Sequence, residues 1–276
     1  MNPVENTIKI KGLIRQGWEE VASEYVKDRI GIFERSAIRL LEILSPLSNC
    51  ALIDIGCGTG VLALQAKNWI GPKGKVIGSD IAASMVKLGL ANTQGKNGIV
   101  FCQMDAEWMG FVDASFDIVV CAYSLFQFPD MKQALNEMIR IMKPGGKLGL
   151  SNWGPGYFSP IALLQRELFR EYGIRPLLTN PIVIKPAELK RMLNEAGFAS
   201  IEMIEETEPI WFTSPEQVWE FNMDMGPFPV MLREQLTKVK QRELIDRFKT
   251  MMEDLITEQG IKSTFHLLYA VAEKGG

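Results

Sequence analysis

The chain has 276 residues, 47% of them hydrophobic, which is enough for one large α/β domain or for a domain with a cap. Its 30 lysine and arginine residues against 33 aspartate and glutamate residues give a net charge of −3. That balance argues against nucleic-acid partners and anionic membranes, because both require concentrated positive charge. No apolar run approaches the ~18 residues of a membrane-spanning helix, and the first residues lack the features of a signal peptide.

Cysteine and histidine usage excludes several kinds of site. The four cysteines form no C-x-x-C pair, so we expect small core residues, no metal site and a reducing, cytoplasmic environment. With His266 as the only histidine, a Ser-His-Asp triad or a multi-histidine metal site is nearly excluded. The cysteines are Cys50, Cys57, Cys102 and Cys121.

Two amphipathic helices are predicted near the start of the chain, at residues 18–26 and 32–44. From Cys50 onward, short apolar runs alternate with longer amphipathic segments, a pattern typical of βα units around a parallel sheet. The predicted strands span residues 51–55, 75–80, 99–104, 116–123 and 147–153, and the predicted helices span 61–70, 83–91 and 131–142.

The regular alternation ends after residue 153. Residues 154–185 contain several Pro and Gly residues and are interpreted as an insertion. A helix at 186–196 and strands at 200–206 and 265–273 are predicted after it, with mostly helical sequence between the two strands. The predicted regions are N-terminal helices (1–48), a core (49–153) and a remainder (154–276) with cap insertions at about 154–185 and 211–262.

A glycine cluster follows the first predicted strand. Asp54-Ile55-Gly56-Cys57-Gly58-Thr59-Gly60 stands at a strand-to-helix junction, where glycines permit a tight turn and backbone N–H groups can face a ligand. The dinucleotide fingerprint G-x-G-x-x-G would need its third glycine at position 61, which is Val61. The spacing G-x-G-x-G therefore counts against NAD.

Two further aspartates stand at the ends of the next predicted strands. Asp80 is placed to accept hydrogen bonds from both ribose hydroxyls of an adenosine, and Asp105 could accept one from the exocyclic amine of adenine. Either aspartate alone would be more typical of a helix cap or a surface charge. Together with Asp54 they occupy three consecutive strand ends, where open α/β sheets bind ligands, which favours a binding site.

Taken in order, these segments resemble the class I S-adenosylmethionine-dependent methyltransferases, specifically the small-molecule branch that includes the ubiquinone/menaquinone-type enzymes. The resemblance runs from about Trp18 to Trp153 and is looser beyond. It implies an α/β fold with a Rossmann-like, doubly wound sheet of seven strands, the last one antiparallel, and a helical substrate cap. The matching segments are Trp18–Tyr25, Ile53–Gly60, Gly78–Ile81, Met104–Glu107, Phe116–Val119 and Arg140–Gly146.

The resemblance also implies which residues bind S-adenosyl-L-methionine, whose product is S-adenosyl-L-homocysteine. Asp54 would face the methionine ammonium, Asp80 would hold the ribose, and Tyr25 would close over the methionine end. The other implied contacts are Gly56, Cys57, Gly58 and Gly60 in the loop, Ile81 and Met85 against adenine, Asp105 and Ala106 at the adenine edge, and the backbone of Cys121 and Ala122.

No catalytic base is evident. Many relatives have a histidine after the fourth strand, where this chain has Gln127, and an amide cannot act as a base. Tyr123 and His266 are candidates, with ordinary packing as the alternative for each. The aromatic and methionine-rich residues 211–231 either pack the cap onto the sheet or line an apolar substrate pocket.

The sequence thus predicts in-line transfer of a methyl group to a small, apolar or aromatic acceptor. The oligomeric state stays open between a monomer and a homodimer. An NAD(P)-dependent oxidoreductase is the alternative enzyme, disfavoured by Val61 and by the lack of a Tyr-x-x-x-Lys site. A non-catalytic S-adenosylmethionine-binding protein is the alternative from another class. The atom that receives the methyl group stays open between O, N, S and C.

Overall fold

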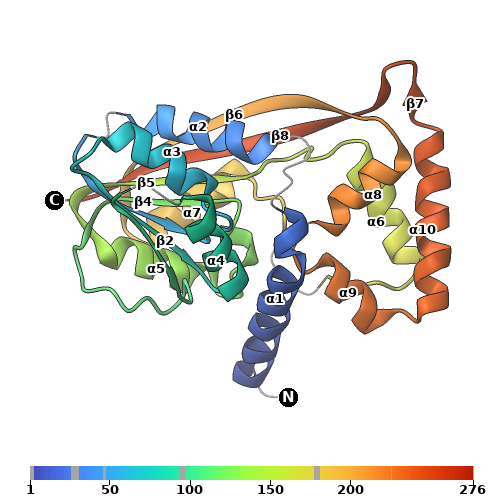
Figure 1. Ribbon diagram of the computed structural model, residues 1–276, viewed down its shortest axis with the longest axis horizontal. Helices are drawn as coiled ribbons and strands as arrows, with labels where there is room; N and C mark the ends of the chain where they lie inside the picture. Colours follow the sequence, from blue (N-terminus) through green and yellow to red (C-terminus); the bar gives the residue numbers. More distant parts are fainter. Residues whose placement is uncertain are drawn as a thin grey trace.

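The computed structural model describes residues 3–25, 31–45, 48–93, 97–176, 181–224 and 226–275. Its centre is one sheet in the order β3-β2-β1-β4-β5-β8-β6, with a short β7 paired to β8 (Figure 1). Strands β1 to β5 are parallel, whereas β8 is antiparallel to both β5 and β6. The predicted Rossmann-like α/β sheet with a late antiparallel strand is therefore confirmed. The strands are β1 Ala51–Ile55, β2 Lys75–Asp80, β3 Ile99–Gln103, β4 Phe116–Ala122, β5 Met142–Trp153, β6 Phe198–Phe212, β7 Ile256–Thr257 and β8 Gly260–Lys274.

Helices cover both faces of the sheet, with α2 and α3 on one side and α5 on the other (Figure 1). The helix α5 shows why a segment of this kind forms a helix against the sheet. It starts with a cap, because Asp130 accepts a hydrogen bond from the backbone N–H of Gln133. Its apolar residues are spaced three or four apart and are buried against the sheet. The helices are α1 Pro3–Tyr25, α2 Ile32–Leu44, α3 Val61–Ile70, α4 Ala83–Asn92, α5 Met131–Ile141, α6 Ile161–Glu171, α7 Pro186–Glu195, α8 Pro215–Met223, α9 Phe228–Gln235 and α10 Lys238–Glu253, with a 3₁₀ turn at Leu125–Gln127.

Helix α1 begins at Pro3, well before the predicted residue 18. Its first turns project away from the sheet (Figure 1). Residues there are largely exposed or half-buried, so they carry little of the apolar periodicity on which the prediction relied. Further along, α1 lies against the loop before α9, where a Cβ on Gly17 would be 2.5 Å from the Cα of Pro227. The absence of a side chain at position 17 allows this close approach.

The two late strands are also longer than predicted. Strands β6 and β8 form a long two-stranded ribbon, which pairs Phe198 with Lys274 at one end and Phe212 with Ile261 at the other. Strand β6 therefore continues past the predicted residue 206, and β8 starts before the predicted residue 265. Side chains of β6 alternate between more and less exposed positions, and this edge strand lacks the continuous apolar run of the central strands. The far end of the ribbon carries the helices α8, α9 and α10 (Figure 1).

Candidate active site

A cavity lies at the carboxyl edge of the parallel strands, where it collects residues from the ends of β1, β2, β4 and β5 and from α1 and α2. One part of its wall is acidic and glycine-rich and comes from the segments after β1, β2 and β3. The other part is aromatic and contains Phe33, Tyr123, Trp153 and Phe126. We call these parts the acidic end and the aromatic end.

The glycine loop after β1 has left-handed backbone geometry at Gly56, Gly58 and Gly60, with φ angles of 69°, 51° and 82°. A Cβ on Gly56 would lie 2.5 Å from the side chain of Ser124, and one on Gly60 would lie 2.8 Å from Phe101. At Gly58 the nearest atom is 3.8 Å away, on Tyr25. Gly58 therefore presents bare backbone to the cavity, whereas Gly60 is required by packing behind it.

Asp54 is buried at the end of β1, and its Oδ2 has no hydrogen-bond partner. Burial and, to a smaller extent, the neighbouring Asp80 raise the pKa of the Asp54 carboxyl to about 8. Buried polar atoms are nearly always paired in native proteins. Asp54 lines the cavity, so an enclosed and unpaired carboxyl oxygen lies directly behind its wall.

Asp80 shapes the loop as well as the cavity. Its Oδ2 accepts a hydrogen bond from the backbone N–H of Gly58 at 3.0 Å, and its Oδ1 accepts one from Ala82 at 2.9 Å. Burial raises the pKa of Asp80, and these two backbone bonds partly offset that effect. Because a carboxylate oxygen accepts more than one hydrogen bond, both oxygens retain capacity for a ligand.

Asp105 and Glu107 follow β3 and share a cation from α1. Lys11 Nζ donates to Asp105 Oδ2 at 2.7 Å and lies 2.6 Å from Glu107 Oε2. Glu107 is buried and also accepts from the backbone N–H of Asp130 at 2.9 Å. The ion pairs hold α1 over the acidic end of the cavity.

Two further contacts fix α1 in place. Trp18 Nε1 donates to Gln127 Oε1 at 2.9 Å. The Glu19 carboxylate accepts from the backbone N–H groups of Ala83 at 2.7 Å and Ser84 at 2.9 Å, and so caps the start of α4. Helix α1 is thus the cover of the cavity on this side.

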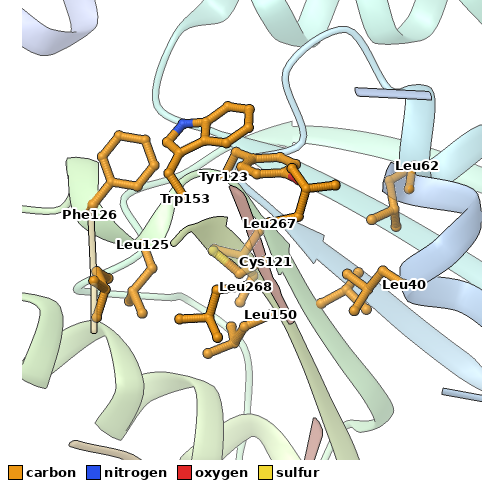
Figure 2. Packing of buried hydrophobic residues seen from close by; sticks show 14 of the residues in the cluster. Leu40, Leu62, Cys121, Tyr123, Leu125, Phe126, Leu150, Trp153, Leu267 and Leu268 are labelled. Carbon is orange, nitrogen blue, oxygen red and sulfur yellow. The ribbon is translucent and has the colours of Figure 1, made fainter. Parts of the chain in front are cut away.

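The aromatic end is a packed set of rings. The ring centroids of Tyr123 and Trp153 are 4.1 Å apart, and Phe33 lies edge-on to Tyr123 at 5.7 Å. Figure 2 shows Tyr123 and Trp153 together, with Cys121 among leucine side chains beneath them. Tyr123 has a left-handed φ of 52°, which is uncommon for a side chain of this size and typical of functional sites.

The Tyr123 hydroxyl is part of a buried hydrogen-bond network. It lies 2.6 Å from Ser36 Oγ, which is 3.0 Å from the Tyr269 hydroxyl, so one serine of α2 joins β8 to the residue that follows β4. Burial raises the pKa of Tyr123 well above its usual value. The group is therefore a neutral hydroxyl held in a buried network.

The structure brings most of the sequence-predicted residues to one cavity. Gly60 lies behind the loop, Cys121 is buried in the core, and His266 packs beneath Gly156, so these three do not line it. The predicted residues that do line the cavity are Tyr25, Asp54, Gly56, Cys57, Gly58, Asp80, Ile81, Met85, Asp105, Ala106, Ala122 and Tyr123.

Sequence reasoning missed several lining residues, namely Lys11, Phe33, Glu107 and Trp153. Lys11, Phe33 and Trp153 are brought to the cavity by contacts between distant segments, whereas Glu107 follows Asp105 after β3 and had the same local signal as that aspartate. No described residue after Trp153 lines the cavity. The aromatic residues of 211–231 instead contact one another and the sheet, as Phe212, Phe221 and Phe265 do.

No group of three or more His, Cys, Asp or Glu residues is placed to hold a metal ion in the described part of the chain. None of the described helices is both long and apolar enough to cross a membrane.

Comparison with known proteins identifies the family. A family model described as "Methyltransferase domain" matches residues 46–197, more than half of the chain. The ubiquinone/menaquinone biosynthesis C-methyltransferase UbiE of Francisella tularensis subsp. novicida (strain U112) is 31% identical over 172 residues, which cover 55% of this chain and 67% of that protein. The nocamycin O-methyltransferase of Saccharothrix syringae is 30% identical over 168 residues, covering 60% of this chain and 56% of the relative.

Solved structures agree in fold. A putative methyltransferase from Bacillus halodurans C-125 superposes with a TM-score of 0.63 at 22% identity, covering 88% of this chain and 100% of that one. The Haemonchus contortus phosphoethanolamine N-methyltransferase 2, in complex with S-adenosyl-L-methionine, gives 0.56 at 18% identity and covers 88% of this chain and 53% of that one. The protein is a member of the methyltransferase-domain family, a class I enzyme that depends on S-adenosylmethionine.

Proposed function

We propose that this methyltransferase transfers the methyl group to a small aromatic or apolar acceptor bound at the aromatic end of the cavity. The observation that carries the proposal is the division of one cavity into an acidic, glycine-lined end and an end walled by Phe33, Tyr123 and Trp153. Planar rings favour stacking with a flat, apolar partner. A charged cofactor and an uncharged acceptor would thus occupy complementary halves of the same space.

The residues of the acidic end fit S-adenosylmethionine. The Asp54 carboxyl, which lines the cavity, is assigned to the ammonium of its methionine part, and the two oxygens of Asp80 are assigned to the ribose hydroxyls. Gly58 lets the ligand meet the backbone, because no side chain fills that space. In the same proposal Ile81 and Met85 pack on adenine, Asp105 and Ala106 meet its edge, and Tyr25, Gly56, Cys57 and Ala122 complete the wall.

When bound there, S-adenosylmethionine supplies an electrophilic methyl group on its sulfonium. The chain contributes alignment and exclusion of water, which can account for much of the acceleration of an in-line displacement. Helix α1 covers the cavity through Lys11, Trp18 and Glu19, and the aromatic end holds the acceptor plane. Because the Tyr123 hydroxyl is held by Ser36, the proposal assigns it no role as a base.

Methyl transfer from isotopically labelled S-adenosylmethionine to a panel of small phenols, aliphatic alcohols and amines tests this proposal. We expect labelled product with phenolic acceptors and little with aliphatic amines of similar size. Phe33→Ala should raise KM for the acceptor and leave the Kd for S-adenosylhomocysteine unchanged, because Phe33 belongs to the aromatic end. Equal turnover of aliphatic and aromatic acceptors would contradict the assignment.

A further inference from the structure

One face of helix α1 forms part of the cavity wall. The residues of α1 that line the cavity are three, four and seven positions apart, which is the spacing that places side chains on one side of a helix. They are Lys11, Ile14, Trp18 and Tyr25. Lys11 is the charged residue of this set, and its side chain is 17% exposed. Helix α1 therefore brings a mostly buried ammonium group to the acidic end.

This ammonium group bridges two carboxylates. Lys11 Nζ lies 2.7 Å from Asp105 Oδ2 and 2.6 Å from Glu107 Oε2. Burial by itself lowers the pKa of Lys11, but the hydrogen bonds to the two carboxylates raise it above its ordinary value overall. Lys11 therefore stays charged at neutral pH. Because both oxygens contact the same nitrogen, Lys11 holds two like charges next to each other at the edge assigned to adenine.

The two carboxylates are held to different degrees. The Glu107 side chain is 4% exposed, and its Oε1 accepts a hydrogen bond from the backbone N–H of Asp130 at 2.9 Å. The Asp105 side chain is 32% exposed, and its Oδ1 accepts from the backbone N–H of Glu107 at 2.9 Å. Without the cation the like charges would repel each other. The more exposed Asp105 would then turn toward water, whereas the buried Glu107 would stay in place.

We infer that Lys11 is a positioning residue for the cofactor, which holds the Asp105 carboxylate where it accepts a hydrogen bond from the exocyclic amine of adenine. The inference rests on the proposed function, because that proposal places adenine against Asp105. It adds to the cofactor site a residue from outside the glycine loop and the strand ends. A site built around a hydrogen bond to this amine rejects a purine that lacks it, so Lys11 contributes to the selectivity for the cofactor.

The test uses two ligands that differ only in this amine. S-adenosylhomocysteine is compared with its 6-deamino analogue, in which a hydrogen atom replaces the exocyclic amine of adenine. Each ligand is titrated calorimetrically into the wild-type protein. We expect S-adenosylhomocysteine to bind at least about tenfold more tightly than the analogue, because a hydrogen bond to an ionised acceptor is stronger than one between neutral groups.

Lys11→Met is the diagnostic variant, because methionine keeps a long apolar side chain but carries no charge. It should reduce the preference to less than about threefold through weaker binding of S-adenosylhomocysteine, while the Kd of the 6-deamino analogue changes by no more than about twofold. Lys11→Arg should restore most of the preference, since a guanidinium group also donates to two carboxylates. Lys9→Met, at an exposed position of the same helix, should keep the wild-type ratio.

A purely structural role of Lys11 would give a different result. If the residue only held α1 in place, Lys11→Met would weaken both ligands by the same factor and leave the preference unchanged. The contacts of Trp18 with Gln127 and of Glu19 with the start of α4 remain in the variant and keep the helix anchored. Thermal unfolding of the ligand-free variants checks that the fold is retained.

An unchanged preference in Lys11→Met would overturn the inference. Tighter binding of S-adenosylhomocysteine to this variant would also overturn it, because Lys11 would then compete with the amine for Asp105. Asp105→Ala separates these results from a failure of the proposed function, since it should abolish the preference if adenine meets Asp105. No preference in the wild-type protein, or a preference that survives in Asp105→Ala, would refute the proposed placement of adenine and the inference with it. A preference lost in Asp105→Ala but kept in Lys11→Met would refute the inference alone.

Discussion

Trp18 Nε1 lies 2.9 Å from Gln127 Oε1, so a helix at the start of the chain is bonded to the turn that follows β4. This contact joins α1, which covers the cavity, to the 3₁₀ turn at Leu125–Gln127, which lines it. An amide at position 127 can accept from the indole and still present a donor. Gln127 cannot act as a base, but it holds α1 in place by accepting the hydrogen bond from Trp18.

Asp80→Ala should raise the Kd for S-adenosylhomocysteine by about 10- to 100-fold. The substitution removes the carboxylate assigned to the ribose, and hydrogen bonds to charged groups contribute about 1.5–3 kcal/mol each. Titration calorimetry measures the change. Asp113→Ala, on a largely exposed side chain that pairs with Arg140, is the matched control. An unchanged Kd in Asp80→Ala would remove this residue from the cofactor site.

Asp54 should make the stability of the ligand-free protein pH-dependent. Its folded-state pKa of about 8 exceeds the ordinary value of 3.8, so the folded protein retains a proton that the unfolded chain releases. Stability from this group is fully present below pH 3.8 and declines as pH rises toward 8. Asp54→Asn removes this dependence and should flatten the curve of melting temperature between about pH 5 and 8.

The same variant should weaken cofactor binding, because the amide that replaces the Asp54 carboxylate has no negative charge for the ammonium. In the wild-type protein the affinity for S-adenosylhomocysteine should increase from about pH 6 to 8 as the carboxyl ionises. Calorimetry across this range compares the two proteins. Parallel affinity curves would show that Asp54 does not face the ligand cation.

Lys11→Met should lower the free energy of unfolding by about 1–3 kcal/mol, because the buried Glu107 loses its cation. It should also speed hydrogen exchange in α1, since two ion pairs that hold the helix are lost. Urea denaturation and exchange mass spectrometry give the two readouts. Lys9→Met, on an exposed position of the same helix, should leave both near the wild-type values.

Ser36→Ala should destabilise the fold by about 1–3 kcal/mol, because two buried tyrosine hydroxyls lose their shared partner. Denaturant unfolding measures the loss. Combining it with Tyr123→Phe in a double-mutant cycle isolates the 2.6 Å contact, and we expect a coupling clearly different from zero. Strict additivity would mean that the serine hydroxyl pairs with water instead.

The sequence predicted the central strands well and indicated that the aspartates of the acidic end stand at successive strand ends, because both depend on local signals. The apolar run before Gly56 and the aspartates at successive strand ends are adjacent to the turns that place them. Lys11 and Trp153 could not be assigned in this way, since each reaches the cavity through contacts with distant segments. His266, in contrast, was a candidate from the sequence but does not line the cavity. The His266 ring packs against Gly156, where a Cβ would lie 2.8 Å from the Nε2 atom of His266.

The close approach of Gly17 to Pro227 ties the beginning of the chain to a much later segment. Helix α1 is held on its inner side by the cavity wall and on its outer side by the loop before α9, where a Cβ on Gly226 would also lie 2.5 Å from the Trp18 ring. Displacing α1 from the cavity therefore requires its contacts with residues 226 and 227 to break, as well as those with the acidic end. A side chain added at Gly17 or Gly226 would act on the cover of the cavity through packing on its outer side.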